Sequence, residues 1–131
     1  MLRLTQLILA LSLLTTVAQS GELTINPVPE PVGPHAALTG KAPNVDAKVF
    51  LIVNPLSTPQ QFWVQKMAKI VDGKKNWLCS IRVGNPGKEH VGQQFVVVAV
   101  ADPIEPLREG DVLSDWPTAK WVSQPVTLTR K

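Results

Sequence analysis

The sequence has very few of the side chains that carry metal-binding or covalent chemistry. It contains one cysteine, two histidines and two methionines among 131 residues. A single cysteine cannot form a disulfide within the chain, so stability must come from an apolar core or from association. His35 and His90 lie in segments not tied locally to Cys79, and these residues lack the spacing of a metal-ligand cluster. The sequence therefore predicts neither a metal site nor a cofactor.

The residue patterns of common catalytic sites are also missing. No serine stands in a G-x-S-x-G context or close to a histidine. Paired carboxylates for glycoside hydrolysis would have to project from rigid strands, whereas the acidic residues fall in expected loops, turns and the N-terminal segment. The acids of 102–111 could together bind calcium, but their spacing fits no recognised loop and favours a solvated acidic loop. We therefore expect a protein that is not an enzyme.

The charge is small and dispersed. The formal net charge is +3, and the lysines form no stripe along one face. A nucleic-acid partner normally requires a clustered basic surface, so we expect no nucleic-acid binding.

The longest uncharged apolar run lies at the start of the chain. Arg3 precedes an uncharged run over 4–17, and Ala18-Gln19-Ser20 then places small residues at the two positions that a signal peptidase reads. This pattern is typical of a secretory signal over residues 1–20, cleaved after Ser20, and is too short for a membrane-spanning helix. A buried first helix is the alternative. We expect a secreted or periplasmic protein with no stable membrane insertion after cleavage.

Proline dominates the next segment, with four prolines within residues 26–35. Proline restricts φ and biases the preceding residue toward extended backbone. Residues 21–35 are therefore expected to form an extended or disordered tether, followed by one folded domain over residues 36–131.

Two later segments show the clearest strand patterns. Residues 76–84 alternate strictly, which places Trp77, Cys79 and Ile81 on one face of a strand. Residues 92–102 are apolar on both faces in the middle, so this strand should lie centrally in a sheet.

Three further segments complete the expected strands. Residues 47–53 form a continuous apolar run rich in β-branched residues, while 61–71 alternate more weakly and could also be helical. Pro125 lies inside the last expected strand and marks an edge or a bulge. Together these patterns predict an all-β, antiparallel β-sandwich of about six to seven strands, with a small barrel as the alternative.

Residues 36–102 carry a series of short strand and turn motifs. The chain has Leu38-Thr39-Gly40 before a strand that begins Ala47-Lys48-Val49-Phe50-Leu51. It then has Asp72-Gly73 ahead of Trp77, and a long strand from Gly92 to Asp102. This series resembles the immunoglobulin-like modules of bacterial surface proteins. Two departures are visible: three residues separate Gly73 from Trp77, and Pro103-Ile104 replaces the Gly-Asn that often follows the final aspartate. The resemblance implies a fibronectin-III-like or bacterial immunoglobulin-like sandwich, and the second departure argues against a calcium-linking role.

Cys79 is interpreted as a core residue because it alternates with apolar neighbours, and free cysteine packs as a small hydrophobe. An intermolecular disulfide and a reactive thiol are the alternatives. The expected core residues are Trp77, Cys79, Ile81, Phe95 and Val97.

This short chain contains four tryptophans and no tyrosine. Trp63, Trp116 and Trp121 could bind sugar rings or a protein partner through their flat faces, or they could cap the open ends of the sandwich. We expect a non-enzymatic binding or structural module of a cell-envelope or extracellular assembly, whose partner is a protein or a polysaccharide. A carbohydrate-binding module and an accessory subunit of a larger enzyme or fibre are the alternatives, and an oligomer is possible.

Overall fold

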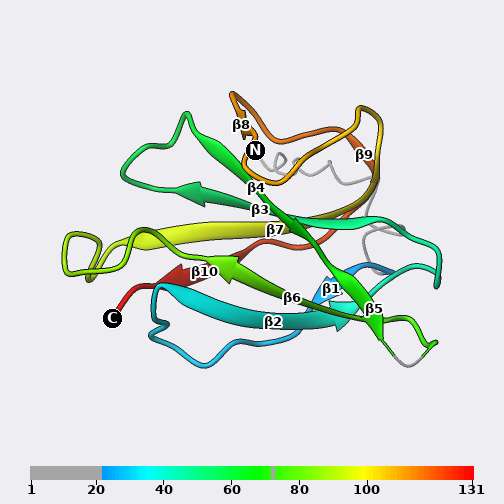
Figure 1. The fold of residues 1–131 in the computed structure, drawn as a ribbon, viewed down its shortest axis with the longest axis horizontal. Coiled ribbons are helices and arrows are strands. Elements are labelled where there is room, and N and C mark those ends of the chain that lie inside the picture. Colours follow the sequence, from blue (N-terminus) through cyan, green and yellow to red (C-terminus); the bar gives the residue numbers. More distant parts are fainter. Residues whose placement is uncertain (1–21, 72) are drawn as a thin grey trace, which may run out of the picture.

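The computed structural model describes residues 22–71 and 73–131, so the expected signal segment lies outside the described residues. The described chain is all-β, with antiparallel strand pairing in two sheets (Figure 1). The four-stranded sheet has the order β1-β2-β6-β5, and the six-stranded sheet has the order β10-β7-β3-β4-β8, with β9 also paired to β7. The strands are β1 (Thr24–Ile25), β2 (His35–Lys41), β3 (Val49–Pro55), β4 (Phe62–Met67), β5 (Lys69–Val71), β6 (Asn76–Arg82), β7 (Gln94–Pro103), β8 (Val112–Leu113), β9 (Ala119–Val122) and β10 (Val126–Thr129).

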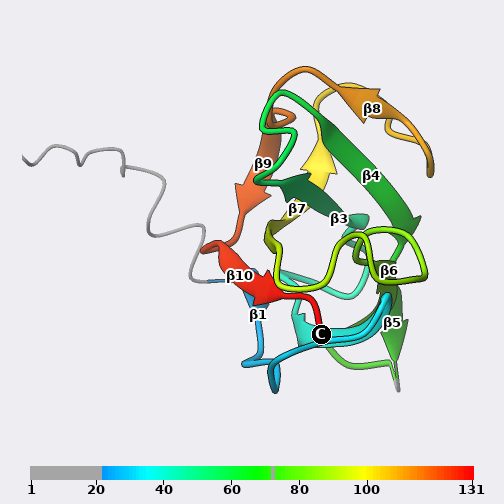
Figure 2. The same cartoon turned by 90° about the vertical axis from the view of Figure 1, so that its left-hand side faces the viewer.

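The two sheets lie as layers around a main core (Figure 2). Strands β3 and β7 form the centre of the six-stranded sheet, and alternate residues of each strand face the other sheet. The main core contains all five residues expected there from the sequence, namely Trp77, Cys79, Ile81, Phe95 and Val97. Burial of such side chains is worth roughly 25 cal/mol per Å² of apolar surface, so this layer dominates the stability of the fold.

Trp77 belongs to the main core and is fully buried, at 0% exposure. Its indole Nε1–H donates to the carbonyl oxygens of Thr24 at 3.1 Å and Lys41 at 3.2 Å. A Cβ on Gly40 would lie 2.5 Å from the Trp77 ring and would also collide with the Thr24 carbonyl oxygen. Glycine at this position therefore allows β1, β2 and the tryptophan to pack together.

The segment 61–71 is two strands rather than one. Strand β4 pairs with β3 in the six-stranded sheet, whereas β5 pairs with β6 in the four-stranded sheet. Ala68 lies buried between them and donates its N–H to the Val49 carbonyl oxygen at 2.9 Å. Because the chain changes sheets here, the expectation of a single strand is corrected, and the strand count rises above the expected six to seven.

Residues 22–35, expected as a tether, pack against the folded domain. Leu23 is fully buried in the main core and β1 pairs with β2. Val32 is also buried, and its N–H donates to the Thr129 carbonyl oxygen at 2.8 Å. Proline favours extended backbone, but apolar residues between the prolines supply buried contacts, so the expected boundary at residue 36 falls inside β2.

Pro125 interrupts the last strand, as the sequence predicted. Val100 lies opposite Val122, but Val97 lies opposite Val126, so the register between β9 and β10 shifts by one residue. Ser123 fills the break: its hydroxyl oxygen accepts the Ala99 N–H at 2.9 Å. A side chain thus replaces the backbone acceptor at the bulge.

The segment 104–118 crosses the outer face of the six-stranded sheet (Figures 1 and 2). A second apolar cluster lies beneath it, and we call this the outer cluster: Phe50, Ile52, Phe62, Val64, Val98 and Val100. Leu107 and Leu113 pack against the outer cluster from this covering segment, and Ala119 does so from the start of β9. The expected acidic loop therefore covers apolar surface with part of its length.

Within the described residues, no helix has the length and apolarity needed to cross a membrane.

Candidate functional site

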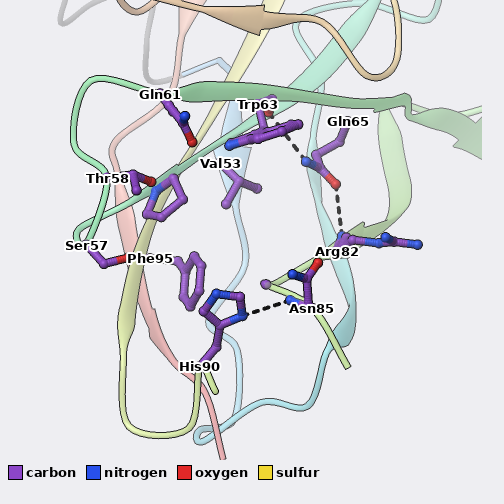
Figure 3. Close-up of a pocket in the computed structure, with 12 residues that line it drawn as sticks. Val53, Ser57, Thr58, Gln61, Trp63, Gln65, Arg82, Asn85, His90 and Phe95 are labelled. Atoms are coloured by element: carbon purple, nitrogen blue, oxygen red, sulfur yellow. Dashed lines mark hydrogen bonds between the residues drawn. The ribbon is translucent and has the colours of Figure 1, made fainter. Parts of the chain in front are cut away.

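A cleft of about 460 Å³ opens between the two sheets at the end where β6 stops (Figure 3). We call it the Trp63 cleft. Its lining comes from β3, β4, β6 and β7 and from the loops 55–61 and 83–93: Val53, Pro55, Ser57, Thr58, Gln61, Trp63, Gln65, Arg82, Gly84, Asn85, His90 and Phe95. Small-molecule sites are typically concave, with an apolar wall and a few convergent polar groups, and this lining has both.

Strand alternation turns Trp63 into the cleft. Its neighbours Phe62 and Val64 face the outer cluster, so Trp63 points to the opposite side of β4, where the four-stranded sheet does not cover it. The indole is 39% exposed. In Figure 3 its ring lies across the cleft above Val53. The result is a flat aromatic wall with one face open to a ligand.

One wall of the cleft is held by Asn54, which is buried at the end of β3. Its side-chain Nδ2 donates to the carbonyl oxygens of Pro59 at 3.0 Å and Gln61 at 2.8 Å. These two bonds fix the loop 55–61, which presents hydroxyl and amide groups to the cleft. Polar residues in a buried setting that are fully hydrogen-bonded rigidify the segments they join.

The opposite wall is the loop after β6. The backbone N–H of Asn85 donates to His90 Nδ1 at 2.9 Å, and the His90 ring packs edge-on against Phe95 with centroids 6.1 Å apart. Gly84 has φ +76°, and a Cβ there would lie 2.6 Å from His90 Nδ1. Glycine therefore allows the backbone to approach the imidazole closely.

Arg130 supports this second wall from beneath and is only 2% exposed. Its Nη1 donates to the carbonyl oxygens of Val83 at 2.9 Å and Asn85 at 2.8 Å, and its Nη2 donates to that of Gly87 at 2.8 Å. Among the described residues, no carboxylate hydrogen-bonds to this guanidinium. The planar guanidinium suits several carbonyl acceptors at once, which explains an arginine here rather than a lysine.

Gln65 joins the two sheets across the mouth of the cleft. Its side-chain Oε1 accepts the backbone N–H of Arg82 at 2.9 Å, while its Nε2 lies 3.4 Å from the Trp63 carbonyl oxygen. The dashed lines in Figure 3 trace this connection, and the Arg82 guanidinium points away from the cleft. The Gln65 side chain is therefore held mainly through its oxygen, because its amide nitrogen makes only one long hydrogen bond.

Cys79 lies outside this cleft, on the inner face of β6. Its thiol donates to the Lys66 carbonyl oxygen at 3.2 Å. Burial away from water raises the pKa of the Cys79 thiol to about 11, an effect that nearby Lys66 partly offsets. A thiol with so high a pKa is protonated at neutral pH, and thiolate is the nucleophilic form.

The other two candidate tryptophans lie apart from the Trp63 cleft. Trp116 is 37% exposed and packs edge-on against Phe62, with ring centroids 4.7 Å apart. It lines a shallow depression on the covering segment. Trp121 is half-buried against the main core, and Lys120 Nζ lies 4.6 Å from its ring centroid. Trp63, Trp116 and Trp121 therefore do not form one site.

Two of the four acidic residues of 102–111 accept hydrogen bonds from backbone N–H groups. Asp102 Oδ1 accepts the Lys48 N–H at 2.9 Å, and Asp111 Oδ2 accepts the Arg108 N–H at 3.0 Å. Within 22–71 and 73–131, no three histidine, cysteine, aspartate or glutamate side chains come together in a group that could hold a metal ion.

Sequence reasoning missed Asn54, Gln65, His90 and Arg130 as site residues. Asn54 carried a weak signal, because this polar residue directly follows a continuous apolar run and precedes Pro55. The others carried none, since their roles depend on segments far apart in the sequence.

Comparison with known proteins leaves the family open: no protein-family model, curated protein or solved structure matches the chain.

Proposed function

We propose that the protein is an exported, non-enzymatic binding module of the cell envelope or the extracellular space, and that it holds its ligand in the Trp63 cleft. The finer immunoglobulin-like classification is part of this proposal. It is supported by Trp77 buried in the main core and by Gly40 packed against it, since both positions belong to the motifs that carry the family resemblance.

One observation carries the choice of site: both walls of the cleft are fixed by hydrogen bonds from buried polar side chains. Asn54 holds the loop 55–61 and Arg130 holds the loop 83–87. Burying polar groups in this way is costly unless every one is paired. A cleft whose walls are held before any ligand arrives loses less conformational freedom on binding.

A catalytic role fits the cleft less well. It contains no carboxylate, cysteine or lysine, and its serine and threonine have no hydrogen bond to His90 among the described residues. Binding without covalent chemistry uses the groups that are present: an aromatic face, amides and hydroxyls.

Indole nuclear magnetic resonance tests the proposal. Four tryptophans give four indole N–H signals, each assignable by single substitution. Native cell-envelope extract, fractionated and added to labelled protein, should shift the Trp63 signal and leave the buried Trp77 signal in place. Fractions that shift only other signals would reject the Trp63 cleft as the binding site.

A second candidate function, assembly with a protein partner, is favoured by the surface around Trp116. Ile104 is 68% exposed there, beside exposed Val112 and Trp116. Clustered apolar exposure of this kind marks protein-interaction surfaces. Sizing of the native protein tests it, because an assembly runs well above the mass of one chain while a monomer in every extract contradicts it.

A further inference from the structure

We infer that the Trp63 cleft takes one ring of a neutral saccharide, stacked on the Trp63 indole. This inference rests on the proposed function and adds the chemical class of the ligand. Three properties of the lining carry it: its charge, its single flat aromatic wall and the fixed direction of its hydrogen-bond donors.

The lining carries no charge that faces a ligand. It contains no aspartate, glutamate or lysine, and the Arg82 guanidinium points away from the cleft in Figure 3. A cationic ligand would find no carboxylate in the lining, because Glu89, which accepts a hydrogen bond from the Asn85 amide at 3.4 Å, is not part of it. An anionic ligand would lose hydration without gaining an opposite charge. The electrostatics therefore favour a ligand without net charge.

The apolar surface is confined to one wall and the base. The open face of the Trp63 indole forms the wall, with Val53 and Phe95 close by. Polar side chains surround this surface on the remaining sides: Ser57, Thr58, Gln61, Gln65, Asn85 and His90. A pyranose ring has the matching arrangement, with C–H groups on its faces and hydroxyls around its rim. A purely apolar side chain would leave the polar groups unpaired.

Two donors have a fixed direction. His90 Nδ1 accepts the Asn85 N–H, so the neutral imidazole carries its proton on Nε2, and Figure 3 shows this nitrogen on the cleft side of the ring. Gln65 Oε1 accepts the Arg82 N–H, which orients its amide as a donor at the same cleft. Ring and hydroxyl oxygens of a sugar accept hydrogen bonds from both donors. The Ser57 and Thr58 hydroxyls and the Gln61 amide bond the remaining hydroxyls around the rim of the sugar.

The test is a titration of the full chain with soluble probes of three classes. These are neutral oligosaccharides of glucose, mannose, galactose and N-acetylglucosamine, acidic oligogalacturonate, and a proline-rich peptide. The readouts are the Trp63 indole signal and calorimetric affinity. At least one neutral oligosaccharide should shift the Trp63 signal, and Trp63→Ala should weaken its affinity at least tenfold. Leu78→Ala is the control, since this side chain is 42% exposed on the outer face of β6 and does not line the cleft, and it should leave the affinity unchanged.

The outcomes separate the inference from the proposed function. If only the peptide or only the acidic sugar shifts the Trp63 signal, the cleft is a binding site but not one for a neutral saccharide, and the inference is overturned alone. If no probe class and no envelope fraction shifts that signal, both are overturned. Should Trp63→Ala fail to fold, Gln61→Leu replaces it, because the Gln61 side chain makes no hydrogen bond within the described residues. An affinity loss of threefold or more supports the inference, and no loss contradicts it.

Discussion

The guanidinium of Arg130 donates to the Asn85 carbonyl oxygen at 2.8 Å and thereby joins the end of the last strand to a wall of the Trp63 cleft. The same Asn85 residue donates its own N–H to His90. A buried side chain at the end of the chain thus orients an imidazole 40 positions earlier, because the intervening strands return β10 to the side of β7.

Arg130→Met should lower the free energy of unfolding by about 3 kcal/mol, because it removes charge-assisted hydrogen bonds and leaves buried carbonyl oxygens unpaired. Urea denaturation measures the change, and faster hydrogen exchange over 83–90 should accompany it. Arg108→Met, at an exposed position, should stay within about 0.5 kcal/mol of the wild type. Equal effects of the two substitutions would contradict the role of Arg130.

Gly40→Ala should destabilise the fold by about 2–3 kcal/mol, since the added methyl group overlaps Trp77 and the Thr24 carbonyl oxygen. Gly33→Ala is the matched control, because a Cβ there meets nothing within 4 Å. Thermal unfolding of both variants measures the difference. A Gly40 variant as stable as the Gly33 variant would show that β1 and the tryptophan can separate at little cost.

Ser123→Ala should cost about 1–3 kcal/mol, because the Ala99 N–H loses its acceptor inside the sheet. Exchange of the Ala99 amide with solvent should accelerate more than that of amides in β3. Ser80→Ala, on the exposed side of β6, serves as the comparison and should be close to neutral. Unchanged protection at Ala99 would mean that another group accepts this bond.

Because the Cys79 thiol is buried and its pKa is raised, we expect the folded protein to lose stability in alkaline solution. Burial holds the thiol protonated up to a pKa of about 11, whereas the unfolded chain releases that proton near its ordinary value of 9.0. The folded state therefore binds more protons between these values, and the free energy of unfolding falls as pH rises from about 9 toward 11. Below pH 9 this group contributes no pH dependence.

Chemical denaturation at several pH values checks this prediction when wild type is compared with Cys79→Ala, which should show a smaller alkaline decline. Thiol labelling of the folded protein should also be slow at pH 8 and fast in urea. Rapid labelling without denaturant would argue against the buried position of Cys79.

The local residue pattern was sufficient to predict several of the strands and which side chains they bury. Residues 76–82 form β6 with strictly alternating burial, and the run expected to be central is β7, which pairs on both sides. Period-two alternation reports directly which side chains share a face of a strand. The cleft could not be found in this way, because Asn54 and His90 acquire their roles from loops that pattern does not position.

The sequence by itself determined the all-β class, the inward face of β6 and the break at Pro125, because alternation and proline geometry act over a few neighbouring residues. Tertiary structure alone decided that the chain changes sheets at Ala68, that residues 22–32 belong to the fold, and that Trp63 faces an open cleft. Alternation assigns Trp63 to one side of its strand, but whether that side is covered depends on where the other sheet ends. That edge is set by packing between residues distant in the chain.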